Sequence, residues 1–177
     1  MRLLDIIKTG ENEKVEFKEN FGKEVIETVV AMANTYGGEI FIGVNDKGKV
    51  KGVKISEESL KNWYNEISQA IEPKINFDIR KEEAENKEIV VVSVPEAPVK
   101  PVSYKGRFYK RVKNSNKLML PSEIAELHNF STGKSWDALE IDKGLEILDK
   151  EKVENYIKLA NSTGRRNFKE DWLTVLK

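Results

Sequence analysis

A junction between a helical and a strand pattern occupies residues 33–46, which read Ala33-Asn-Thr-Tyr-Gly37-Gly38-Glu-Ile-Phe-Ile-Gly43-Val-Asn45-Asp46. Before it, apolar residues recur at helical spacing from about Lys23 to Thr35. The glycine pair can adopt the positive φ of a helix C-cap, and residues 39–44 form a β-rich run. A helix that leads directly into an apolar strand is typical of a domain that packs helices on a sheet.

Patterns on both sides extend this α+β assignment. We predict a short helix over 2–8, a strand over 15–18, and a β-hairpin that pairs 39–44 with 49–53. A helix opens at Ser56, and antiparallel strands follow at 75–80 and 88–94. A further strand at 107–112 and a helix at 121–129 complete the pattern. The expected fold is α+β, with a mixed or antiparallel sheet flanked by helices.

The strand signals stop after about residue 132. We therefore predict a domain over 1–132 and a small helical extension over 133–177, with helices at 150–160 and 168–176. The last predicted helix ends without a cap, which favours the interpretation that the extension begins a further region of a longer protein.

Composition excludes several classes of function. The 177 residues include no Cys and one His, so disulfides, Cys-based metal sites and thiol nucleophiles are absent. Acidic and basic residues balance at 30 each, and no apolar run reaches the roughly 20 residues that span a membrane. The N-terminus lacks the features of a signal peptide, which predicts a cytoplasmic protein. The Lys, Glu, Ile and Val bias with a single Gln is typical of thermophiles.

Three carboxylates from separate segments are candidate metal ligands. Glu11 precedes a predicted strand that contains Glu16, and Asp46 ends the junction. Converging carboxylates bind Mg²⁺ or Mn²⁺, which can activate water without a histidine. The spacing of five puts Glu11 and Glu16 on opposite faces of a regular strand, so Glu11 must lie on a bend. The alternative is an edge strand with ordinary surface charges. Neither GxGxxG nor a P-loop motif occurs, which disfavours an ATPase.

A basic stretch from Lys100 to Lys117 contains no acid, and none occurs between Glu96 and Glu123. Its cations can neutralise phosphates, and its interleaved aromatic residues can stack on bases. In a strand over 107–112, Arg107, Tyr109 and Arg111 share one face. The alternative is a solvated hairpin that is basic by chance. The candidate nucleic-acid-binding residues are Lys18, Lys105, Arg107, Tyr109, Lys110, Arg111, Lys113, Asn114, Ser115 and Asn116.

Five motifs in order resemble the AlbA-like domain that prokaryotic proteins share with the Schlafen family. They are Glu11-x4-Glu16-Phe-Lys18, Ala33-Asn-Thr-x-Gly-Gly38, Ile42-Gly-Val-Asn-Asp46 with Gly52-Val53, Tyr109-x-Arg-Val112 with Asn114-Ser-Asn116, and Ser135-Trp-Asp137. The resemblance implies nucleic-acid binding, often in transcriptional regulators. In Schlafen proteins two such lobes form a basic groove that cuts RNA with a divalent metal and three acids. The resemblance therefore implies that Glu11, Glu16 and Asp46 are catalytic and metal-binding residues. It also implies that the protein is a homodimer.

Three hypotheses follow for this chain. The leading one is a nucleic-acid-binding domain, for DNA or RNA, in a regulator-like protein. The second is a metal-dependent endoribonuclease that uses Mg²⁺ or Mn²⁺. The third is an oligomerisation or scaffold module.

Overall fold

The computed structural model describes residues 3–133 and 148–164. The chain divides into two compact units, Met1–Asp137 and Ala138–Lys177. The first unit is α+β and contains every strand of the described residues. The second contains the helix α5 (Lys150–Ser162), whose N-cap Asp149 accepts a hydrogen bond from the Lys152 amide at 3.2 Å. The helix predicted at 168–176 lies outside the described residues. No described helix is long and apolar enough to cross a membrane.

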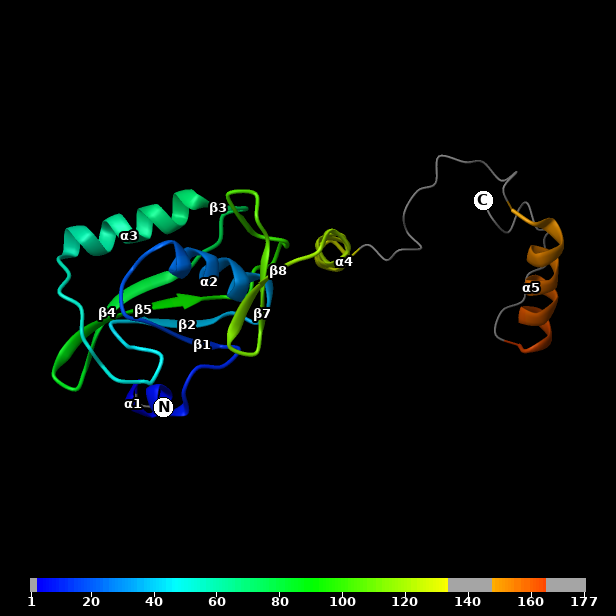
Figure 1. Cartoon of the computed structure of the whole chain (residues 1–177). Helices are drawn as coiled ribbons and strands as arrows, with labels where there is room; N and C mark the ends of the chain where they lie inside the picture. The colour runs from blue at the N-terminus through cyan, green and yellow to red at the C-terminus, as the bar shows by residue number, and fades with distance from the viewer. Residues whose placement is uncertain (1–2, 134–147, 165–177) are drawn as a thin grey trace. The chain divides into compact units, whose positions relative to one another are not determined.

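A four-stranded mixed sheet forms the centre of the first unit (Figure 1). The strand order is β1 (Val15–Lys18), β2 (Gly38–Ile42), β5 (Lys87–Val94) and β4 (Asp78–Ala84). β1 runs parallel to β2, and the other pairs are antiparallel. The strand predicted at 88–94 is confirmed as β5, which pairs on both sides and has a buried apolar run. The predicted fold class is also confirmed.

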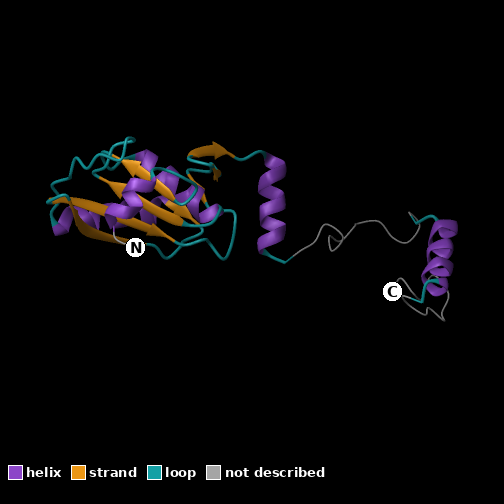
Figure 2. Ribbon diagram, turned by 90° about the horizontal axis from the view of Figure 1, so that it is seen from below, coloured by secondary structure: helices purple, strands orange, loops and turns teal. Residues whose placement is uncertain are grey.

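Helices cover both faces of the sheet (Figures 1 and 2). α2 (Lys23–Asn34) and α3 (Glu57–Ala70) contribute to a core with Ile40, Ile42 and Val92. The opposite face carries Phe17 and Phe41, which pack with α1 (Leu3–Thr9). The faces differ because successive residues of each strand point to opposite sides. Residues 16 and 18 of β1 therefore lie on the α2 side, and this position matters for the site.

The predicted hairpin between 39–44 and 49–53 is wrong. A turn does form, because Gly48 donates its amide to the Asn45 carbonyl at 2.8 Å, but the return segment makes only an isolated bridge, Val44 to Val50. β2 pairs instead with β1 and β5, which bury both of its edges. Gly52, at a φ of 81°, is part of a segment that then departs toward α3.

Two small two-stranded sheets and a helix complete the described part of the first unit. β3 (Ile71–Glu72) pairs with β6 (Ser103–Tyr104), and β7 (Tyr109–Val112) forms a hairpin with β8 (Ser115–Leu118). We call this last pair the β7–β8 hairpin. α4 (Pro121–Ser131) comes next and is capped by Glu123, whose carboxylate accepts from the Leu120 amide at 2.9 Å. The predicted strand at 107–112 is thus shorter than expected, because Arg107 belongs to the turn that follows β6.

Candidate functional site

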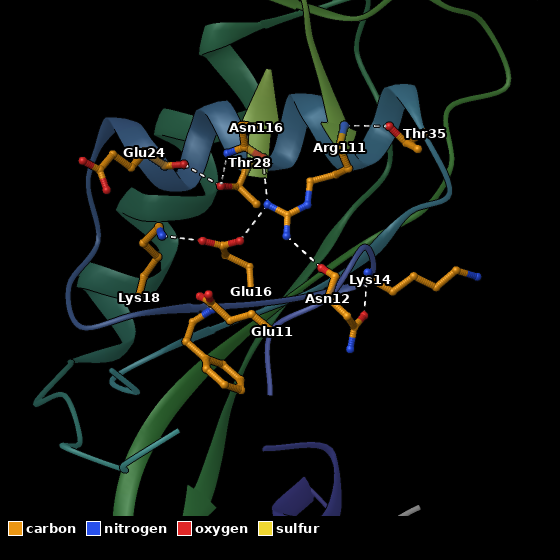
Figure 3. A network of polar contacts seen from close by, with 11 residues as sticks. Glu11, Asn12, Lys14, Glu16, Lys18, Glu24, Thr28, Thr35, Arg111 and Asn116 are labelled. Atoms are coloured by element: carbon orange, nitrogen blue, oxygen red, sulfur yellow. Dashed lines mark hydrogen bonds and ion pairs between the residues drawn. The ribbon is translucent and has the colours of Figure 1, made fainter. Parts of the chain in front are cut away.

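The candidate site lies where the β7–β8 hairpin meets β1 and α2 (Figure 3). Residues 10–12 precede β1 and fold back along its outer edge. Gly10 adopts a φ of 75°, which allows the bend that the spacing of Glu11 and Glu16 requires. The Glu11 carboxylate accepts a hydrogen bond at 3.1 Å from the Phe17 amide, which points away from β2. The Asn12 amide donates a hydrogen bond to the Val15 carbonyl at 3.0 Å. The preceding loop therefore satisfies polar groups on the exposed side of an edge strand.

Arg111 and Glu16 form a buried ion pair at the centre of the site. Nη1 of Arg111 lies 2.7 Å from Oε2 of Glu16, and the exposed side-chain fractions are 0% and 6%. Glu16 also pairs with Lys18, so one carboxylate is shared by two cations. A buried charge is tolerated in a protein when it is paired and hydrogen-bonded, which describes both partners.

The guanidinium of Arg111 connects three further segments (Figure 3). Nη1 also donates to Asn116 Oδ1 at 2.8 Å, and Nη2 donates to the Asn12 carbonyl at 2.8 Å. Asn116 in turn donates to Thr28 Oγ1 of α2 at 2.8 Å. Within the described residues, Nε of Arg111 is buried with no hydrogen-bond partner. One arginine thus joins residues 11–12 before β1, which we call the edge loop, to β1, both hairpin strands and α2.

Asn34 makes a second connection between α2 and the segments that follow β5. Its Nδ2 donates to the carbonyls of Val102 and Tyr109 at 2.8 and 2.9 Å, and its Oδ1 accepts the Val102 amide at 2.7 Å. Next to it, Thr35 Oγ1 accepts the Arg111 amide at 3.0 Å. The Asn-Thr pair of the junction thereby fixes the position of β7 along α2. In the sequence, Asn34 stands out only as a member of the motif over 33–38, and its role in positioning β7 is not predicted.

The predicted cations fall into two groups. Arg111 is buried, Lys18 pairs with Glu16, and Lys110 pairs with Glu123 of α4. Lys105, Arg107 and Lys113 are exposed, and among the described residues none of them has a carboxylate within 4.0 Å. Only the second group is free to meet a polyanion without breaking an ion pair.

The uncharged residues of the predicted binding set also divide into buried and exposed ones. Tyr109 is buried and donates its hydroxyl to Glu27 at 3.3 Å, so it shares a face with Arg111 as expected, but that face points toward α2. Asn116 belongs to the arginine network, whereas Asn114 and Ser115 are exposed at the end of the hairpin.

The exposed cations stand on two tight turns. Lys105 and Gly106, with φ of 51° and 71°, reverse the chain between Tyr104 and Arg107, which exchange two backbone hydrogen bonds of 2.9 Å. The Lys105 ammonium lies 5.2 Å from the centre of the Tyr104 ring, within the range of a cation–π contact. Lys113 has a φ of 57° at the turn of the β7–β8 hairpin. Extended chain from 107 to 113 spans roughly 20 Å, at about 3.3 Å per residue.

The three predicted metal ligands do not form a metal centre in the described residues, where no group of three His, Asp or Glu side chains is arranged to bind an ion. Both oxygens of Glu16 face cations, Lys18 and Arg111, and one oxygen of Glu11 accepts an amide. Burial raises the pKa of Glu11, the Phe17 amide opposes this shift, and Glu16 and Asp46 add to it by charge repulsion. The most buried of these carboxylates, Glu16, is thus already paired with two cations.

Comparisons with known proteins agree with this architecture. The Schlafen, AlbA_2 family model matches residues 11–120, more than half of the chain. No curated protein is significantly similar in sequence. Among solved structures, the DIP2311 protein of Corynebacterium diphtheriae shares the fold with 19% identity and a TM-score of 0.58. The similarity covers 85% of this chain but only 30% of that protein.

A second solved structure is the N-terminal domain of a protein of Nitrosomonas europaea that is named as related to the ATP-dependent DNA helicase RecG. It is 26% identical, with a TM-score of 0.47, and the similarity covers 68% of this chain and 95% of that domain. The family match includes the edge loop, the junction and the β7–β8 hairpin, which together form the arginine network. This chain therefore belongs to the Schlafen AlbA_2 family.

Proposed function

We propose that the first unit binds nucleic acid through a basic surface formed by Lys105, Arg107 and Lys113, which we call the turn cations. The observation that carries this proposal is that these exposed cations lie in a stretch without any acid, in a protein of zero net charge. These three exposed cations occur in the stretch between Glu96 and Glu123, which contains no acid in the sequence. Unpaired Lys and Arg side chains neutralise phosphates and release counterions.

The geometry supports recognition of a backbone. Two turns, roughly 20 Å apart along extended chain, place cations at separate points instead of in one pocket. Contacts between such cations and phosphates position a nucleic acid without reading its sequence. The proposal includes a role within a regulator-like protein that acts as a homodimer, and the ligand is DNA or RNA.

The test compares binding of fluorescent single-stranded and duplex DNA and RNA by anisotropy, over a range of salt concentrations. The Lys105→Ala/Arg107→Ala double variant should bind more weakly, and its salt dependence should fall by about one unit of log–log slope for each lost phosphate contact. Lys61→Ala is the matched control, because Lys61 is an exposed lysine of α3. An unchanged affinity and slope in the double variant would refute the proposal.

A metal-dependent ribonuclease receives no comparable support. The ion pairs of Glu16 with Arg111 and Lys18 would have to break before this carboxylate could ligate a metal. Incubation of the same RNAs with Mn²⁺ or Mg²⁺ provides the check, and cleavage that Glu16→Gln abolishes without loss of binding would establish that activity.

A further inference from the structure

Tyr36 is an exposed aromatic residue just beyond the C-terminal end of α2. It is 58% exposed, although Asn34 and Gly37 on either side of it are buried. Within the described residues, its ring stacks on no other aromatic ring and its hydroxyl has no hydrogen-bond partner. The ring therefore contributes little to the packing of the first unit and is available to a ligand.

The backbone on both sides of Tyr36 is held in place. The Lys100 ammonium donates a hydrogen bond to the Thr35 carbonyl at 3.2 Å. The Gly37 amide donates to the Met32 carbonyl at 2.9 Å. Gly37, with a φ of 68°, packs so closely against the end of β5 that a Cβ atom would lie 2.6 Å from a backbone oxygen. A ring on such a fixed backbone loses less conformational freedom when it binds a ligand than a ring on a flexible loop.

The turn of the β7–β8 hairpin lies close to this ring. The Thr35 hydroxyl, one residue before Tyr36, accepts the Arg111 amide at 3.0 Å. Lys113 follows Arg111 by two residues, which span at most about 7 Å. One of the three turn cations is therefore near the end of α2.

Lys14 brings a further exposed cation to the same end of α2. Its carbonyl accepts the amide of Glu39, three residues after Tyr36, at 2.8 Å, and its own amide donates to Asn12 Oδ1 at 2.9 Å. The Lys14 side chain extends away from the arginine network (Figure 3). In the part of the chain that the structure describes, it has no carboxylate within 4.0 Å. An accessible ring thus lies near two cations that are free to contact phosphates.

We infer that this surface binds a single strand of nucleic acid, with Tyr36 stacked on an unpaired base and with Lys14 and Lys113 on neighbouring phosphates. Cations alone would bind a duplex as well, because a duplex presents phosphates at high density. Stacking on a protein ring requires an uncovered base face, which a single strand offers and the interior of a duplex does not. The inference rests on the proposed function and adds to it the strandedness of the ligand.

Fluorescence anisotropy of the full chain tests this with labelled oligothymidylate, oligouridylate and a DNA duplex of the same length. Tyr36→Ala should weaken binding of a single strand about 5- to 100-fold, because it removes base–aromatic stacking. Tyr36→Phe keeps the ring and should retain the affinity. The salt dependence of Tyr36→Ala should match that of the parent, since the ring carries no charge. Lys14→Ala should instead lower the log–log salt slope by about 0.7 for a single strand.

Two controls separate stacking from other effects. Tyr156→Ala alters an exposed tyrosine of α5 and should leave the affinity unchanged. Duplex binding should be the same for Tyr36→Ala and for the parent. The melting temperature should also be the same, because the ring has no hydrogen-bond or aromatic partner within the described residues.

The outcomes distinguish this inference from the proposed function. Single-strand binding that Tyr36→Ala leaves unchanged, or an equal loss of duplex binding, would overturn the inference. The proposed function would still stand in that case if the Lys105→Ala/Arg107→Ala variant bound more weakly. Absence of binding to every probe would refute both. Weakening of either single strand by Tyr36→Ala supports the inference, and the strand that binds more tightly identifies DNA or RNA as the ligand.

Discussion

Arg111 and Glu16 lie 95 positions apart in the sequence, yet their side chains meet at 2.7 Å in the interior. The pair joins a hairpin late in the first unit to the first strand of the sheet. Since charges at this depth are costly when unpaired, the pair ties the hairpin position to the fold of β1. Arg111 is therefore a positioning residue for the hairpin and does not itself reach the surface.

Loss of either partner should be strongly destabilising. We expect Arg111→Met or Glu16→Gln to lower the unfolding free energy by about 3–5 kcal/mol, because the remaining buried group loses this ion-pair partner. Urea unfolding followed by circular dichroism measures this change. Lys113→Ala is the control on the same hairpin and should shift stability by less than about 0.5 kcal/mol. Equal effects of the buried and the exposed substitution would contradict the assignment.

The arginine network should couple to the turn cation of the hairpin. Asn116→Ala removes the acceptor for Arg111 and the contact with Thr28, and we expect it to loosen the hairpin without unfolding the unit. In a double-mutant cycle of nucleic-acid binding, the loss caused by Lys113→Ala should then shrink in the Asn116→Ala background. The loss caused by Lys105→Ala should persist, because Lys105 stands on a different turn. Additive losses for both pairs would show that the network does not position Lys113.

Asn34 should tolerate no apolar replacement. Asn34→Leu would leave the Val102 amide and two carbonyls without their partner inside the protein. Each buried backbone group left unsatisfied costs about 1–3 kcal/mol, so the variant should be among the least stable single substitutions. Thermal unfolding measures the loss. Asn114→Leu, at an exposed position, is the comparison, and a similar melting temperature for the two variants would argue against the role of Asn34.

Glu11 should make stability depend on pH. Burial raises the pKa of Glu11 above 4.5, so the folded state binds its proton more readily than the unfolded state does. The unfolding free energy should therefore fall as pH rises from about 4.5 through the folded pKa. Glu11→Gln keeps an oxygen for the Phe17 amide and removes the ionisation. Relative to wild type, this variant should gain stability between pH 4 and pH 7 in urea titrations, whereas Glu13→Gln, at an exposed position, should not. Parallel profiles for Glu11→Gln and wild type would exclude this contribution.

Local patterns predicted most helices and strands, because burial of one face leaves a period in the sequence. The N-cap at Ser56 is an example, since its hydroxyl accepts the Ser59 amide at 3.1 Å as expected. The prediction of a hairpin after β2 was wrong because β2 pairs with β1 and β5. These strands are distant in the sequence, and a local turn signal does not encode such pairing.

The site shows the same limit. Alternation placed Tyr109 and Arg111 on one face, but only tertiary packing determines that this face meets α2. The absence of acids around the basic stretch marked its cations as free, and this interpretation ignored carboxylates distant in sequence. Glu16 pairs with Arg111, and Glu123 pairs with Lys110. The remaining free cations could be identified only once these pairs were known.

The loop that precedes β1 has a consequence for assembly. Glu11 and Asn12 engage the Phe17 amide and the Val15 carbonyl, which are groups that an incoming strand would need for ladder pairing. An additional strand therefore cannot pair with this edge of β1, either in β-augmentation or in cross-β aggregation. Any association of copies at this edge must use side chains. A deletion that shortened this loop would expose the Phe17 amide and the Val15 carbonyl to strand pairing and so promote aggregation.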